Sequence, residues 1–333
     1  MLLYILRRIL WMVPTMFGIT VLLMLVIQLA PGDPAAIATA GDLDMQGQQA
    51  GGDTQSAYDK FRARFHLDEP IYVQYWEWVK NVATLDFGSE FFQPNVQVAD
   101  ELWRRLKITV PLSLIATLLS YLIALPLGIY SAVKRGSFWD KVITFGLFLL
   151  YSLPTFWAGL MLILAFGATG LEWFPVIGLH GKDAASMTTW QYVMDTIWHG
   201  VLPVATLTYG GVAYLSRQMR VGMLETIQQD YIRTARAKGL DRKKIIFKHA
   251  LRNSVIPVIT VFASILPILI GGSVLVETIF NIPGMGLYAF EGLVMRDYNI
   301  IMATVTFSAF MTLLGFLLSD ILYAVVDPRI AYD

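Results

Sequence analysis

Long apolar runs alternate with polar stretches along this chain of 333 residues. Because an α-helix rises 1.5 Å per residue, about 20 apolar residues in a row suffice to cross the hydrocarbon core of a bilayer. The runs that we expect to cross are residues 9–30, 108–133, 142–168, 200–215, 254–276 and 300–319. The run 200–215 is short, but Ile197 and Trp198 extend it enough to cross. The pattern predicts an all-α membrane protein with six transmembrane helices.

The first apolar run follows Arg7 and Arg8, an arrangement that a secretory signal peptide shares. Its 22 uncharged residues exceed the apolar core of about 7–15 residues that a signal peptide has, and further spans follow. We therefore predict a retained first transmembrane helix over residues 1–30. The sequence Pro31-Gly32-Asp33-Pro34 should end it sharply.

Residues 31–107 form a long polar stretch that predicts a separate loop subdomain. Its Gly- and Gln-rich part, Asp42–Ser56, has no hydrophobic period and is predicted to be a flexible insert. Short helices are expected at Tyr58–Phe65 and Ile71–Val82, separated by Asp68-Glu69-Pro70. The second helix contains Tyr72, Tyr75, Trp76 and Trp78. Such aromatic residues are typical of a membrane interface, of packing within a small subdomain, or of a contact with substrate or a binding protein.

Shorter polar stretches connect the later spans. Lys134-Arg135-Gly136 predicts a tight turn, and residues 169–196 and 277–299 predict two exposed loops. The prolines within the predicted spans are Pro14, Pro111, Pro126, Pro154, Pro203, Pro257 and Pro267. A proline frees a backbone carbonyl that a neighbouring group must satisfy, which suits helices that bend, although static bundles use prolines as well.

A polar island of 29 residues, Glu225–Asn253, contains eight of the 25 lysines and arginines. A first short helix is predicted from about Leu224 to Lys238. Its shared apolar face comprises Leu224, Ile227, Tyr231 and Ala235. Gly239 should end this helix in the left-handed conformation, and Asp241 should cap a second helix. From the residues alone, the island is either a surface that docks a partner or a solvated loop whose charges set membrane orientation.

Basic residues in short loops predict the orientation, because they are retained on the cytoplasmic side. With the N-terminus inside, sixteen lysines and arginines fall on the inner side and two fall in short outer loops. The seven in residues 31–107 do not count, since long loops are exempt from this rule. Both termini and the loop 222–253 are therefore predicted to be cytoplasmic, and residues 31–107 extracytoplasmic.

Composition excludes several classes of site. The chain is 56% hydrophobic and 15% charged, whereas about a quarter of the residues in an average soluble domain are charged. The net charge is zero, so no nucleic-acid partner is indicated. There is no cysteine, hence no thiolate metal site. The four histidines, which lie far apart in sequence without ligand spacing, are His66, His180, His199 and His249. We expect no metal site.

Catalytic motifs are missing as well. Gly181-Lys182 lacks the preceding glycines of a phosphate-binding loop, so the chain is not expected to hydrolyse ATP. The serines in the predicted spans have no histidine in the spans that could activate them as nucleophiles. Only Glu277 and Asp320 lie near span ends, whereas ion-coupled carriers keep ionisable groups near the midplane. Both carboxylates suit interfacial groups or partners of Arg296 or Arg329, with substrate contact as the alternative. Energy for transport should enter from outside the bundle.

The segment Asp230–Leu240, with the sequence DYIRTARAKGL, resembles the coupling loop in permease subunits of ABC importers. Together with HALRN at His249–Asn253 and the later Pro257, it is similar to the dipeptide, oligopeptide and nickel branch. Arg233 and Arg252 depart from the general importer pattern, which has Glu and Pro there, as is usual in the peptide branch. The resemblance extends over nearly the whole chain.

This resemblance implies the type I ABC importer permease fold in the inner (cytoplasmic) membrane of a bacterial cell. It divides the chain into a first transmembrane helix (1–30), an extracytoplasmic loop subdomain (31–107) and a core permease domain (108–333) with five helices and the coupling loop 222–253. The chain would be a transport subunit and no enzyme, forming with a second permease a path for peptides or a related solute. Its other implied partners are an extracytoplasmic solute-binding protein, the lipid bilayer and two cytoplasmic ATPases. The ATPases would bind ATP and magnesium. No cofactor is expected in this chain.

The coupling helix implied by the resemblance comprises Tyr231, Ile232, Arg233, Thr234, Ala235, Arg236, Ala237, Lys238, Gly239 and Leu240. Ala235 and Gly239 would permit close approach, Tyr231 and Leu240 would be apolar anchors, and Arg233 and Lys238 would pair with acidic groups of the ATPase. The substrate-binding residues are not predicted, and the substrate stays open among dipeptides, oligopeptides, nickel chelates, glutathione and oligosaccharides. Two other classes stay open: an ABC-type exporter or lipid-handling permease, and an uncoupled channel or scaffold.

Overall fold

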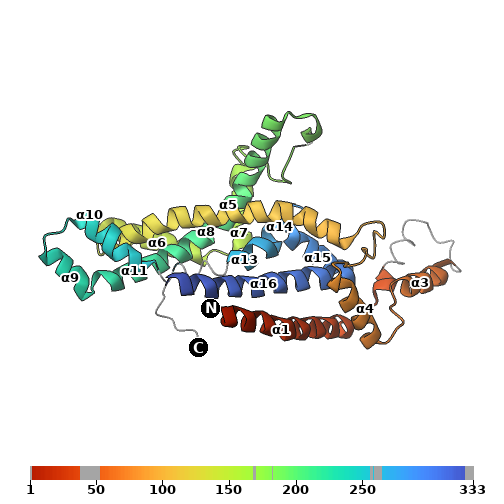
Figure 1. Cartoon of the computed structure of the whole chain (residues 1–333). Helices are drawn as coiled ribbons and strands as arrows, with labels where there is room; N and C mark the ends of the chain where they lie inside the picture. Colours follow the sequence, from red (N-terminus) through yellow and green to blue (C-terminus); the bar gives the residue numbers. More distant parts are fainter. Residues whose placement is uncertain are drawn as a thin grey trace. The chain divides into compact units, whose positions relative to one another are not determined.

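The computed structural model is built from α-helices (Figure 1). It describes residues 2–37, 53–167, 170–181, 183–255, 258 and 265–326. Within these ranges no β-strand forms, and the one isolated bridge pairs Ser89 with Gln97. The prediction of an all-α chain is therefore confirmed.

The chain divides into two compact units. Unit 1 comprises the described residues up to Ile108 and Gly284–Leu317, and unit 2 comprises Thr109–Pro283 and the stretch from Leu318. The helices of unit 1 are α1 (Leu2–Leu29), α3 (Asp53–Arg64), α4 (Ile71–Ala83) and α15 (Met285–Met295). Those of unit 2 are α6 (Phe138–Ser152), α7 (Thr155–Phe166), η1 (Ala184–Ser186), α8 (Thr189–Ile227), α9 (Asp230–Ala237), α10 (Arg242–Lys244), η2 (Ile245–Ala250), α11 (Leu251–Ser254), α13 (Ile265–Gly271) and α14 (Val274–Ile279). The long helices α5 (Val98–Val133) and α16 (Tyr298–Val326) contribute residues to both units.

Three described helices are long and apolar enough to cross a membrane: Tyr4–Leu29, Val98–Val133 and Tyr298–Leu318. They cover the predicted runs 9–30, 108–133 and 300–319, apart from the last residue of the first and third runs. The pair α6 and α7 qualifies only when taken together. Most of the run 254–276 lies outside the described residues, and α8, which contains the run 200–215, is not among the helices that qualify. The count of six spans therefore stays a prediction.

The run 142–168, predicted as one continuous span, is broken in the structure. The axes of α6 and α7 differ by 102° at the break. Pro154 stands before the first residue of α7, and it disfavours the helical conformation for the residue ahead of it, so Leu153 is extended. The carbonyl of Leu153 accepts a hydrogen bond from the hydroxyl of Tyr209 in α8 at 2.9 Å. A side chain of the neighbouring helix thus satisfies a backbone group that the bend has freed.

Several stretches expected to be irregular are helical. The end of the expected insert, Asp53–Ser56, belongs to α3, and the rest of that insert lies outside the described residues. The loop expected at 169–196 ends at Thr188, because Thr188 and Gln191 form a capping box that starts α8. Residues 285–295 of the third expected loop form α15. At the start of α8, local capping thus extends a helix into a stretch that its polar composition assigned to a loop.

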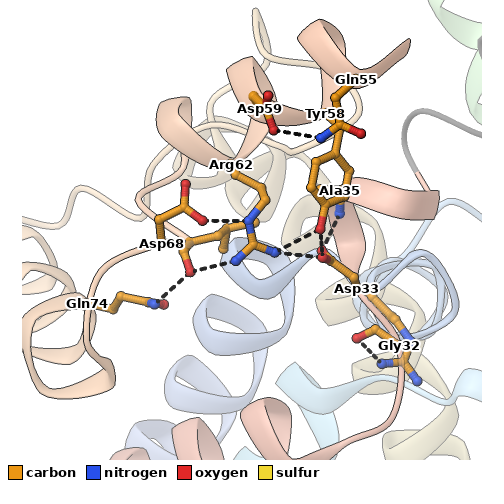
Figure 2. Close-up of polar contacts among 11 residues, drawn as sticks. Gly32, Asp33, Ala35, Gln55, Tyr58, Asp59, Arg62, Asp68 and Gln74 are labelled. Carbon is orange, nitrogen blue, oxygen red and sulfur yellow. Dashed lines mark hydrogen bonds and ion pairs between the residues drawn. The ribbon is translucent and has the colours of Figure 1, made fainter. Parts of the chain in front are cut away.

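An arginine-centred network ties the polar loop of unit 1 to the end of α1 (Figure 2). The guanidinium of Arg62 in α3 donates to Asp33 and to Asp68, both at 2.6 Å, and the hydroxyl of Tyr58 donates to the same Asp33 carboxylate. Partial burial opposes ionisation of Asp33, but the bonds from Tyr58, Ala35 N–H and Arg62 outweigh it and hold the pKa of Asp33 below its ordinary value. The carboxylate is therefore ionised at neutral pH, and the network is a charged clamp.

A buried carboxylate anchors the loop that precedes α5. Asp297 is fully buried and accepts hydrogen bonds from the backbone N–H groups of Phe91 and Ile300. Burial raises its pKa to about 6. Nearby, the hydroxyl of Tyr288 in α15 donates to Glu90 at 2.8 Å. The loop around Ser89–Phe91 is thus fixed from α15 and from the start of α16.

The packing of α4 partly resolves the role of its aromatic residues. Tyr75 and Trp78 lie against a cluster formed by Met24 and Ile27 of α1 and Ile301 and Met302 of α16. Tyr72 and Trp76 are exposed instead. Half of the aromatic set therefore packs within unit 1, and the other half is left for a lipid or protein surface.

The Tyr209 hydroxyl can be tested directly. We expect Tyr209→Phe to lower the free energy of unfolding by about 1–3 kcal/mol, because it leaves the Leu153 carbonyl without its donor in an apolar environment. Thermal unfolding of the detergent-solubilised chain measures the change. Tyr214→Phe, at an exposed position of the same helix, is the control and should have no effect. Equal midpoints for both variants would contradict this role of Tyr209.

Candidate functional site

The polar island folds into a helical elbow, here defined as residues 228–254, beyond the end of α8 (Figure 1). The chain leaves α8 at Ile227, and Gln229 adopts an extended conformation immediately before α9. Asp230 then stands in the first turn of α9, where a carboxylate interacts favourably with the helix dipole. The helix predicted from Leu224 to Lys238 is therefore two helices separated by a break at Gln228-Gln229.

The turn at the tip of the elbow is a Schellman motif. The N–H of Gly239 donates to the carbonyl of Arg236 at 3.0 Å, and the N–H of Leu240 donates to the carbonyl of Ala235 at 3.3 Å. This pattern requires a left-handed residue, and Gly239 has φ +73°. Glycine adopts that conformation without the steric cost that a Cβ atom brings. The helix stop predicted at Gly239 is confirmed.

The second arm of the elbow begins at Asp241, as predicted. The carboxylate of Asp241 accepts a hydrogen bond from the backbone N–H of Lys243 at 3.0 Å and caps α10. The chain continues through η2, a π-helical segment, into α11. The amide of Asn253 in α11 donates to the Tyr231 hydroxyl of α9 at 2.8 Å, which ties the two arms together.

The inner face of the elbow is buried against the helices of unit 2. Ile232 is completely buried and Ala235 is 7% exposed, and both belong to the same apolar cluster as Met219 and Met223 of α8. Ala124 and Ala132 of α5, Ile245 and Ala250 of η2, Leu215 of α8 and Val258 complete the cluster. The elbow is therefore packed as part of the bundle and is not a solvated loop.

Close backbone packing reinforces this attachment. A Cβ atom at Gly222 of α8 would lie 2.5 Å from the carbonyl oxygen of Ser254 in α11. A Cβ atom at Gly128 of α5 would lie 2.6 Å from the carbonyl oxygen of Ser216 in α8. Both distances are far below van der Waals contact, so only glycine fits at these two positions.

A partly buried ion pair links α8 to the turn between α5 and α6. The guanidinium of Arg220 donates to Asp140 at 3.1 Å, and the same carboxylate accepts from the Ser131 hydroxyl and from the backbone N–H of Gly136. The side chain of Asp140 is almost completely buried. The predicted turn at Lys134-Arg135-Gly136 is present and is fixed by this carboxylate.

The outer face of the elbow is cationic and open. Among the residues expected there, the exposed ones are Tyr231, Arg233, Thr234, Arg236, Ala237, Lys238, Gly239 and Leu240. The Arg233 side chain has only a 3.5 Å contact with Asp230, whose side chain is 96% exposed, and such a surface pair contributes little stability. This face can therefore offer its charges to a partner without breaking a strong internal bond.

A cleft of about 390 Å³ opens beside this face. Its apolar lining includes Ile227, Leu240 and Ile246, and Arg236 and Arg242 contribute the charged groups. The combination suits a partner side chain with an apolar body and an anionic end.

The structure changes one role expected from the sequence and adds another. Ala235 points into the cluster of unit 2, so its small size serves the internal packing of the elbow. Ile232, which was assigned to the helix without a role, is the residue that anchors α9. Sequence reasoning missed it because the expected apolar face was continued across the break at Gln228-Gln229, where the helical phase is reset.

The two carboxylates near span ends have different environments. Glu277 in α14 is 1% exposed and accepts a hydrogen bond from the Thr109 hydroxyl of α5 at 3.1 Å. Asp320 in α16 is half-buried. Arg296, suggested as a partner for these groups, donates to the backbone carbonyls of Ala30 and Gly32. In this structure Glu277 serves internal packing and is not open to a solute.

The sequence matches described families over almost its whole length. Residues 124–332 match the family described as "Binding-protein-dependent transport system inner membrane component", and residues 1–113 match its N-terminal counterpart. The chain is 39% identical to the oligopeptide transport system permease protein AppB of Bacillus subtilis over 329 residues, covering 99% of both chains. It is 36% identical over 345 residues to the dipeptide transport system permease protein DppB of Alkalihalophilus pseudofirmus, covering both chains fully.

The fold is similar to that of a solved ABC transporter. The structure titled "Inward facing conformations of the MetNI methionine ABC transporter" matches with a TM-score of 0.52 and 17% sequence identity. The match covers 68% of this chain and 96% of the other. At this identity the likeness concerns the fold alone.

The left-handed turn at Gly239 gives a test of the elbow's geometry. We expect Gly239→Val to loosen the turn at a cost of about 1–3 kcal/mol, because valine strains at positive φ. Gly239→Asn is the matched control, since asparagine tolerates this conformation and an added Cβ would meet nothing within 4 Å. Faster trypsin cleavage in residues 228–254 of the detergent-solubilised valine variant alone is the expected result. Equal cleavage of both variants would contradict the motif.

Proposed function

Because the chain belongs to the family of binding-protein-dependent transport system inner membrane components, it is a permease subunit of an ABC importer, and we propose that its solutes are peptides. It is a multi-pass protein of the inner membrane with the type I ABC importer permease fold. The proposal for peptides is supported by the names of its relatives, which are permeases of oligopeptide and dipeptide transport systems. The substrate path is proposed to form between this chain and a second permease.

The proposed topology has six spans with both termini in the cytoplasm. The three long apolar helices and the bent pair α6–α7 support four of these crossings. The fifth is assigned to the central part of α8 and the sixth to the run 254–276, on the basis of their apolar sequence. The excess of basic residues on one side supports an inner location for the elbow and an outer location for α3 and α4.

The elbow is proposed to dock into the partner ATPases. The observation that supports this best is the division of α9 into two faces. Ile232 and Ala235 fix the helix to the bundle, while Arg233, Arg236 and Lys238 are exposed. Acidic groups of an ATPase would pair with these cations, and the cleft beside Leu240 would accept an apolar side chain. ATP and magnesium would be bound by the ATPases, with no cofactor in this chain.

The proposed mechanism is a rigid-body movement. Closure of an ATPase dimer on ATP would displace the docked elbows, and the buried cluster of unit 2 would pass this displacement to α5 and α8. The change would favour the outward-facing state of the paired permeases, which then accept solute from a binding protein. Hydrolysis would reset the cycle. An exporter would need no binding protein, and a channel or scaffold would copurify with no ATPase.

The orientation is testable because the chain has no cysteine. We expect a membrane-impermeant maleimide to label Lys80→Cys in α4 of spheroplasts, whereas Thr234→Cys in the elbow should react only after permeabilisation. Both positions are exposed, so accessibility within the protein is matched. Labelling of Thr234→Cys in intact spheroplasts would contradict the proposed orientation.

Docking is tested by reversing charge on the exposed face of α9. We expect the double variant Arg233→Glu, Lys238→Glu to insert normally, to recover less coexpressed ATPase on affinity purification, and to lose most uptake of labelled peptides. The reason is that two cations facing acidic groups become anions. Lys60→Glu, at an exposed position of α3, is the control and should behave like the unaltered chain. Normal ATPase recovery by the double variant would rule out the docking role.

A further inference from the structure

One histidine and two glutamates come together in unit 1, at a place that the sequence did not indicate. The ligand atoms of His66, Glu69 and Glu77 all lie within 4.8 Å of one another. His66 and Glu69 belong to the turn between α3 and α4, and Glu77 lies in α4. The four histidines lie far apart in sequence, so no metal site was expected from them, but the turn after α3 brings one histidine close to two carboxylates.

The local backbone explains how the turn reaches α4. His66 is in the left-handed conformation with φ +54°, and the N–H of Glu69 donates to its carbonyl. The turn therefore doubles back, and Pro70 starts α4 immediately afterwards. The imidazole Nδ1 of His66 lies 3.0 Å from a carboxylate oxygen of Glu69.

Among the described residues, no lysine or arginine is ion-paired with the two carboxylates of this group, although Arg64 lines the adjoining cavity. Within the part of the chain that the structure describes, the one ion pair of Glu69 is with His66. Lys80, one turn further along α4, lies over the ring of Trp76 instead. Two carboxylates held this close repel each other unless a cation lies between them.

A cavity of about 260 Å³ adjoins the cluster and is lined by His66 and Glu77. Asn81, one helical turn after Glu77, adds an amide oxygen on the same face of α4. Trp78 also lines the cavity, and its buried Nε1 has no hydrogen-bond partner among the described residues.

We propose that His66, Glu69 and Glu77 bind a divalent transition-metal ion of the Zn²⁺ class, with water in the remaining positions. Nitrogen and oxygen ligands of zinc lie about 2.0–2.2 Å from the ion, so two ligands in a tetrahedral site are about 3.4 Å apart. The His66–Glu69 pair is already near this spacing, and Glu77 reaches it by a small side-chain rotation. The imidazole favours zinc over calcium, which takes six to eight oxygen ligands. The ion would tie the turn between α3 and α4 to the body of α4.

The test is equilibrium dialysis of Zn²⁺ against the full chain in detergent, purified without a polyhistidine tag. We expect one Zn²⁺ per chain, bound at least tenfold more weakly by His66→Gln and by Glu77→Gln. Glu77→Gln keeps the result interpretable if His66→Gln disturbs the turn. Glu172→Gln, an exposed carboxylate in unit 2, is the matched control and should bind as the unaltered chain does.

Three results would overturn the proposal. They are the absence of saturable Zn²⁺ binding, unchanged affinity in both site variants, and equal displacement of Zn²⁺ by Ca²⁺, which would show that the imidazole is not a ligand. Cobalt(II) gives a second readout, because its visible absorption changes when nitrogen ligates it. That absorption should be lost in His66→Gln and retained in Glu172→Gln.

Discussion

Burial of Ile232 and Ala235 against α5 and α8 is the constraint on which the elbow depends. A segment with this many lysines and arginines would otherwise remain in solvent, because burying its charged groups would not stabilise the fold. Two apolar side chains on one face of α9 reverse that outcome, because each contributes burial energy only when the helix lies against Met219 and Met223. The same packing leaves the cations on the opposite face. A surface suited to a partner is thus a by-product of how the helix is attached.

The attachment matters because coupling by rigid bodies requires stiff connections. At Gly222 and Gly128 the backbones of neighbouring helices come so close that a Cβ atom would not fit between them. The ion pair of Asp140 with Arg220 holds the turn between α5 and α6 against α8. The bend before Pro154 is stabilised by a specific contact as well, because the Tyr209 hydroxyl donates a hydrogen bond to the carbonyl of Leu153 that the bend frees. At each of these places, a specific contact between side chains or backbones holds the helices together where their packing or their backbone hydrogen bonding is irregular. The backbone carbonyl that the bend in unit 2 frees therefore has a hydrogen-bond donor.

Features with a local cause could be predicted from the sequence, and those with a tertiary cause could not. Gly239 and Asp241 have the conformation and the capping role that their residue types favour, because turn and cap chemistry depends on neighbours in the chain. The apolar runs likewise predicted three long helices. Ile232 was missed because the break at Gln228-Gln229 shifts the helical phase, and composition carries no sign of such a shift. The cluster of His66 with Glu69 and Glu77 was missed because it depends on how a turn folds back onto a helix.

The π-helical segment η2 has a consequence for the face that α11 presents to α8. A π-turn holds one more residue than an α-turn, so every residue after it is rotated by about 100° relative to a regular helix. Ser254, which follows the segment, is completely buried like Ala250 at its end, and the Ser254 hydroxyl donates to the Ala250 carbonyl at 2.8 Å. Deleting one residue between Ile245 and Ala250 would restore regular winding and turn a charged side of α11 toward the core. The face that α11 turns toward α8 therefore depends on the number of residues in η2 as much as on their side chains.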